Sequence, residues 1–165
     1  MRFLVAILPF ALVACGTPAT ENTMVDAPAS GGDAAVAVSG TPVVSNAWVR
    51  LPAVPGRPAA AYFTLNGGAA DDALVSVTTP AAKRTELHES MEHGGVMTMA
   101  AIENVPLGAG AAMDFAPGGK HVMLFDVSPD LAAGGTTELT VTFANGPAVT
   151  VPAALVAPGG DAPAR

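Results

Sequence analysis

The sequence predicts an all-β, single-domain protein, most simply a Greek-key β-sandwich. Its length of 165 residues leaves room for one compact domain. Its 18 glycines and 15 prolines favour many short strands joined by turns over long helices. Short apolar or alternating runs recur along the chain between turn residues, as expected when strands pack with one face on a core.

The first element, residues 1–15, has the pattern of an export signal. Arg2 precedes an apolar run that is too short to span a bilayer as a helix, and the segment ends in Leu12-Val13-Ala14-Cys15-Gly16. This ending resembles a bacterial lipobox, in which the cysteine is acylated and becomes the new N-terminus. We therefore expect a lipoprotein anchored to the membrane through Cys15. The alternative is a soluble secreted protein in which Cys15 has no role.

Residues 16–41 are rich in Ala, Gly, Pro, Ser and Thr, which predicts a disordered tether. Residues 42–157 then form the expected domain, and residues 158–165 a short disordered tail. Nine strands are predicted within the domain, at residues 46–50, 59–66, 73–79, 84–90, 96–103, 111–115, 121–127, 136–144 and 147–156. Asn145-Gly146 is the clearest hairpin signal, and His93-Gly94-Gly95 marks another turn.

Charge and cysteine content exclude several functions. The formal net charge is −7 and only seven Lys and Arg are spread over the chain, so no nucleic-acid partner is expected. Cys15 is the single cysteine, and an acylated Cys15 leaves the domain without a thiol. An electron-transfer copper site, which needs a thiolate, is therefore excluded.

Histidine and methionine gather in one stretch of the chain. Apart from Met1 and Met24, every methionine and every histidine lies between residues 88 and 123. Met97 and Met99, and likewise His121 and Met123, are two residues apart, so each pair shares one face of a strand. Imidazole with thioether is a poor set for Zn²⁺, Ca²⁺ or Mg²⁺ and a good one for the soft ion Cu(I).

The spacing of His88, Met99, His121 and Met123 reads H-x10-M-x21-H-x-M. This pattern resembles the signature of the periplasmic copper chaperone family PCuAC, and the resemblance extends from about residue 44 to 156. The flanking residues also resemble the family: Glu86-Leu87-His88, Gly95-Val96-Met97-Thr98-Met99 and Pro117-Gly118-Gly119-Lys120-His121-Val122-Met123-Leu124.

The resemblance implies a cupredoxin-like fold and one Cu(I) ion bound by those four residues. It also implies a periplasmic location and delivery of copper to the binuclear centre of cytochrome c oxidase. The expected partners are the copper subunit of that oxidase or a thioredoxin-like copper protein. A metalloenzyme would want three or more nitrogen or carboxylate ligands with an open position. The chain has only three histidines, and two of them already belong to the mixed histidine–thioether set, so we expect no enzyme.

Other residues near the pattern have less defined roles. His93, Met97 and Met91 are possible auxiliary ligands or neighbours of the ligands. Glu86, Glu89 and Glu92 either form a solvated edge or orient an imidazole. The competing hypothesis is a non-metal β-sandwich lipoprotein that acts as a binding or structural module, in which these His and Met side chains are scattered or buried.

Overall fold

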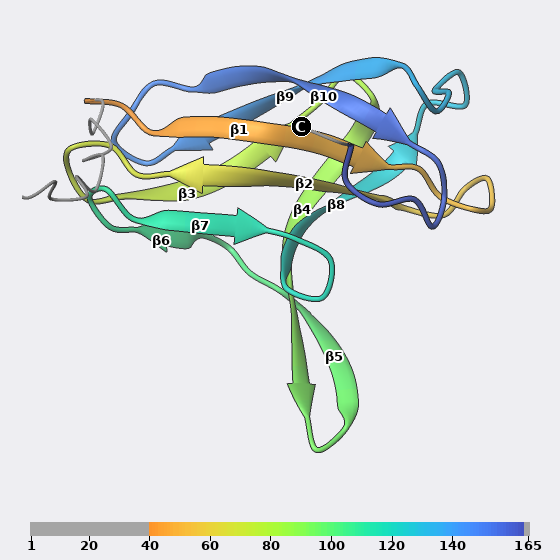
Figure 1. The fold of residues 1–165 in the computed structure, drawn as a ribbon, viewed down its shortest axis with the longest axis horizontal. Coiled ribbons are helices and arrows are strands. Elements are labelled where there is room, and N and C mark those ends of the chain that lie inside the picture. The colour runs from red at the N-terminus through yellow and green to blue at the C-terminus, as the bar shows by residue number, and fades with distance from the viewer. Residues whose placement is uncertain (1–39, 164–165) are drawn as a thin grey trace, which may run out of the picture. The chain divides into compact units, whose positions relative to one another are not determined.

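The computed structural model describes residues 40–163 of the chain (Figure 1). The predicted export signal, Cys15 and most of the predicted tether lie outside the described residues. Within residues 40–163 there is no helix long and apolar enough to cross a bilayer.

Ten strands form between residues 40 and 163, one more than the sequence predicts. The additional strand is β6, which has only three residues with Pro106 at its centre. A segment this short, with a proline in it, has no alternation from which a strand could be predicted. The strands are β1 (Val43–Arg50), β2 (Ala59–Asn66), β3 (Asp72–Thr78), β4 (Ala82–His93), β5 (Val96–Ala101), β6 (Val105–Leu107), β7 (Ala112–Phe115), β8 (Lys120–Val127), β9 (Thr136–Phe143) and β10 (Val149–Val156).

The strands hydrogen-bond in the order β5-β4-β8-β7-β2-β1-β10-β9-β3-β6, with β8 also pairing with β2. Side chains from both halves of this order share one buried cluster: Leu87 of β4 and Phe63 of β2 belong to it, as do Leu74 of β3 and Leu139 of β9. The continuous sheet therefore folds over and packs its two halves face to face around one core. The predicted all-β, single-domain sandwich is confirmed.

Period-two alternation decides which side chains enter this core. On β8, Val122 and Leu124 are fully buried in the cluster, and His121 and Met123 consequently point to the other face of the sheet. On β4, Leu87 faces the core, so Glu86 and His88 lie on the outer face. The outer face of β4 and β8 is where the polar and sulfur-containing side chains gather.

The β4–β5 hairpin extends beyond the rest of the sheet (Figure 1). β8 pairs with β4 as far as Glu89, and the last residues of β4 pair with β5 alone. Gly94 and Gly95 have φ of 60° and 80°, the left-handed values that a tight two-residue hairpin turn requires. The predicted turn at this position is confirmed, and it places β5 beside β4.

The β9–β10 hairpin also forms where the sequence predicts it, with Val149 opposite Val141. Its connection is longer than a two-residue turn, and neither Asn145 nor Gly146 has a positive φ. The backbone N–H of Asn145 instead donates to the carboxylate of Asp72, 2.9 Å away. A side-chain contact from a distant strand therefore replaces the local turn chemistry.

Candidate metal centre

The candidate centre lies on the outer face of three adjacent strands, in the order β5, β4, β8. Residues that pair across neighbouring strands point to the same side of the sheet. His88 on β4 pairs with His121 on β8, and their ring centroids are 6.0 Å apart. The two predicted imidazole ligands, separated by more than thirty residues in the chain, are thus direct cross-strand neighbours.

The two predicted thioether ligands flank this histidine pair. Met123 is opposite Glu86, one position along the face from the pair, and is half-buried. Met99 on β5 is opposite Ser90, which is two residues after His88 on the same face. Both methionines are diagonal neighbours of His88, a relation that puts Cα atoms about 7–8 Å apart and long side chains within reach of each other. The fold therefore gathers all four predicted ligands on one face.

His121 is almost completely buried, with 5% of its surface exposed. Its Nδ1 lies 2.9 Å from the carbonyl oxygen of Gly119. A carbonyl only accepts hydrogen bonds, so Nδ1–H donates and Nε2 carries the lone pair. The contact orients the ring and leaves Nε2 as the nitrogen that can bind a metal.

His88 has the opposite arrangement. Its Nε2 lies 3.0 Å from Oε2 of Glu86, whose carboxylate accepts the Nε2–H bond. Its Nδ1 is buried and has no hydrogen-bond partner among the described residues. Burial lowers the pKa of the His88 imidazole, because the charged form loses hydration. The ring is therefore neutral near pH 7, with a free lone pair on Nδ1.

The three glutamates near His88 have different roles, a point that the sequence leaves open. Glu86 pairs with both Arg84 and His88, and so orients an imidazole. Glu89 lies on the other face and pairs with Lys120 at 2.6 Å. Glu92 is opposite Met97, beyond the histidine pair.

The three possible auxiliary residues are also separated by the fold. Met97 lies two residues before Met99 on the same face of β5 and is exposed. Met91 pairs with Thr98, which puts it on the opposite face of the hairpin from Met99. His93 is the last residue of β4 and pairs through its backbone with Val96. Of the two methionines, the register brings Met97 to the candidate face.

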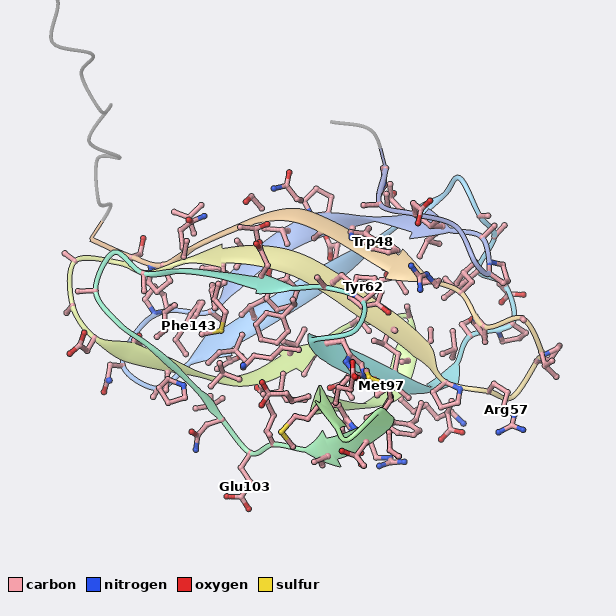
Figure 2. The ribbon with its side chains drawn as sticks, turned by 60° about the horizontal axis from the view of Figure 1, so that its bottom comes forward. Trp48, Arg57, Tyr62, Met97, Glu103 and Phe143 are labelled. Carbon is pink, nitrogen blue, oxygen red and sulfur yellow. The ribbon has the colours of Figure 1, made fainter. Side chains whose placement is uncertain are left out.

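One residue beside the centre, Tyr62, could not be predicted from the sequence to lie there. Tyr62 on β2 continues the same face beyond His121, with ring centroids 6.4 Å apart, and packs against Trp48 at 4.5 Å (Figure 2). Burial raises the pKa of the Tyr62 phenol, partly countered by the nearby cation of Arg50. The phenol is therefore neutral at physiological pH. Only the pairing of β2 with β8, which no local pattern encodes, brings this ring to the site.

The donor set suits a soft metal ion. Among residues 40–163, no three His, Cys, Asp or Glu side chains converge on a point where they could hold a metal. The donors that this face offers are two imidazoles and thioether sulfur, and soft donors of this kind favour a soft, monovalent ion over Zn²⁺, Ca²⁺ or Mg²⁺.

Comparison with known proteins identifies a family and curated relatives of this chain. Residues 43–155 match the family described as "Putative lipoprotein LpqE-like". A curated relative, "Putative lipoprotein Lxx21020" of Leifsonia xyli subsp. xyli, is 34% identical over 92 residues, which are 55% of each chain. The chain spans about half the length of the curated relatives it matches.

Solved structures similar to this chain in fold and sequence include PCuAC domains. The apo PCuAC domain of PmoF2 is 26% identical, with a TM-score of 0.61 over 74% of this chain and 95% of that domain. The solution structure of the copper(I) form of DR1885 from Deinococcus radiodurans is 27% identical, with a TM-score of 0.52 over 76% of this chain and 83% of that protein. The predicted resemblance to PCuAC domains is confirmed.

Proposed function

The chain belongs to the LpqE-like lipoprotein family, and from that premise we propose that it is a copper chaperone. One copper(I) ion binds on the outer face of β4, β5 and β8 through His88, Met99, His121 and Met123, and an acceptor protein then takes it. The observation that carries the proposal is the register: His88 and His121 pair directly across two strands, and both methionines lie diagonal to His88.

The hydrogen bonds of the two histidines support the same function. His88 and His121 each have one ring nitrogen fixed by a hydrogen bond and the other carrying a lone pair. Thioether sulfur favours copper(I), and unlike a thiol it is not lost to disulfide formation in an oxidising compartment. The similarity to the copper(I) form of DR1885 adds to this support.

Copper is the cargo of this protein, and we propose no catalytic step. From the resemblance to PCuAC, the acceptor is the copper subunit of cytochrome c oxidase, for its binuclear centre, or a thioredoxin-like copper protein. The corresponding location is the periplasm, with an acyl anchor on Cys15. Lipoprotein names in the family and in the Leifsonia relative agree with such an anchor.

An anaerobic titration of copper(I) against a chromophoric competitor tests the proposal. We expect the wild-type protein to bind one equivalent and the His121→Asn variant to bind far more weakly. Asparagine can keep the hydrogen bond to Gly119 but offers no imidazole lone pair. Met113→Leu is the matched control, because Met113 lies on β7, packed against the core.

The competing hypothesis is a non-metal β-sandwich module. It predicts no copper(I) binding by the wild-type protein under anaerobic reducing conditions, and that result would reject the chaperone. Equal loss of binding in the Met113→Leu control would also count against this site, because it would point to a general effect on the fold.

A further inference from the structure

The side chains of the candidate centre are graded from buried to exposed. His121 is 5% exposed, Met123 is half-buried, and Met99 is 55% exposed. Met97, two residues before Met99 on the same face, continues the series outward at 57%. Figure 2 labels Met97 on the β4–β5 hairpin. We propose that Met97 pairs with Met99 as an outer, transient copper(I) position through which the ion leaves the four-ligand site.

This inference rests on the proposed function and adds a residue to it. The four-ligand site holds the ion at rest, and Met97 takes part only while the ion is handed over. Met97 is therefore a ligand of the moving ion and not of the resting one.

Packing does not account for the position of Met97. Every residue of β5 is exposed, and beyond Glu89 no third strand within residues 40–163 pairs with the hairpin. Of the seven large apolar side chains exposed in the described part of the chain, four lie on this hairpin: Met91, Val96, Met97 and Met99. A thioether held in water contributes little to the core, whereas its soft sulfur and flexible chain suit a ligand that must engage and release a metal.

The hand-over requires no change in oxidation state. A bond from copper to the sulfur of Met97 forms as the bonds to the two imidazoles and to Met123 break, and the ion remains copper(I) throughout. Because Met97 is exposed, the incoming ligand of an acceptor can reach the ion there, whereas His121 is buried. Two thioethers alone bind copper(I) less tightly than the complete set, so the outer position is scarcely occupied at equilibrium.

The hairpin supplies its own control residue. Met91 is 49% exposed, and its partner Thr98 shows that it lies on the opposite face from Met97. Methionine and leucine have similar volumes, so Met97→Leu and Met91→Leu remove one exposed sulfur each at little cost to the fold. The two variants differ only in the face from which the sulfur is lost.

The test compares affinity with the rate of release, using full-length protein loaded with one copper(I). The competitor titration gives the dissociation constant, and the absorbance that develops after adding excess bathocuproine disulfonate gives the release rate. For Met97→Leu we expect a dissociation constant within about threefold of wild type and release slower by about tenfold. For Met91→Leu both quantities should be unchanged, and for Met99→Leu the affinity itself should fall.

Several results would overturn the inference. If Met97→Leu releases copper(I) at the wild-type rate, Met97 does not lie on the exit path. If Met97→Leu loses as much affinity as Met99→Leu, Met97 is a ligand of the resting ion. Equal slowing by Met91→Leu makes the effect a general property of the hairpin. If the wild-type protein binds no copper(I), the proposed function fails first; if it binds and only the kinetic difference is missing, this inference alone fails.

Discussion

His88 and His121 keep different ring nitrogens free of hydrogen bonds, and the reason lies in their hydrogen-bond partners. The carboxylate of Glu86 accepts from Nε2 of His88, and the carbonyl of Gly119 accepts from Nδ1 of His121. Each acceptor fixes one tautomer and therefore one free lone pair. Glu86 is in turn paired with Arg84, so the orientation of His88 depends on a chain of three charged or polar side chains.

Copper(I) affinity should depend on pH through the protonation of His88. Burial lowers the pKa of His88, so its lone pair stays available below the ordinary histidine pKa of about 6.5. We expect affinity to fall as the pH drops through the lowered pKa of His88, by up to about tenfold per pH unit, because a proton then competes with the metal for this ring. Competitor titrations between about pH 7.5 and 5 would measure this, the range bracketing the unperturbed histidine pKa.

The His88→Asn variant is the control for this pH dependence. It should bind more weakly at every pH and show a shallower slope, because one proton no longer competes with the metal. If the wild-type protein and His88→Asn show the same affinity at every pH, His88 is not a ligand.

At the scale of single residues, the sequence predicted the candidate ligands but not their partners. The spacing from His88 to Met123 resembles a family signature, and the fold brings these residues to one face. The roles of Glu86 and Glu89 could not be predicted, because alternation alone does not say which strand will lie opposite. Glu86 meets His88 on the outer face, whereas Glu89 meets Lys120 on the other.

The β4–β5 hairpin is the element that brings Met99 to the histidines. Its turn depends on Gly94 and Gly95, whose positive φ values any L side chain adopts only with strain. A β-branched residue at Gly94 costs about 1–2 kcal/mol there. Among the strands of the described domain, none pairs with the hairpin beyond Glu89 to compensate for this cost. The strain should therefore fray the hairpin end and displace Met99.

For Gly94→Val we expect copper(I) affinity to fall by about tenfold, a loss of about 1.4 kcal/mol, with little change in the thermal midpoint of the core. Gly134→Val is a matched control, because Gly134 has φ 86° and open space around it, yet lies between β8 and β9, outside the hairpin. This variant should lower the thermal midpoint and leave the affinity intact. Equal affinities for Gly94→Val and wild type would show that the hairpin end does not position the site.

Elements with strong local signals were predictable, and elements fixed by distant contacts were not. The turn at Gly94-Gly95 and the strands on both sides of it follow from local residue choice. β6 was missed because its three residues are held by pairing with β3 and carry little pattern of their own. The β9–β10 connection likewise depends on Asp72, which no local rule could place beside Asn145.

In the domain as a whole, the two faces of one sheet have different roles: one face stabilises the fold, and the other carries the candidate metal ligands. The inner face supplies the apolar cluster, and the outer face of β4, β5 and β8 carries the donors. The all-β class was predictable from turn frequency and alternation, but the strand order was not, because β4 lies between β5 and β8 only through long-range pairing. The sequence therefore proposes the candidate ligands as a set of residues, whereas their arrangement on the sheet could not be predicted.

The same separation leads to a prediction about the whole chain, in which the anchor and the copper site are independent. The candidate ligands and their partners Glu86 and Gly119 all belong to the domain, far along the chain from Cys15. Acyl chains would contribute about 0.8 kcal/mol of membrane affinity for each buried methylene group. We therefore expect Cys15→Ser to move the protein from the membrane to the soluble fraction, with its copper(I) dissociation constant unchanged. Cell fractionation followed by competitor titration of both forms measures the two properties separately. A wild-type protein found in the soluble fraction would contradict the anchor, and a weaker affinity in Cys15→Ser would contradict the independence of anchor and site.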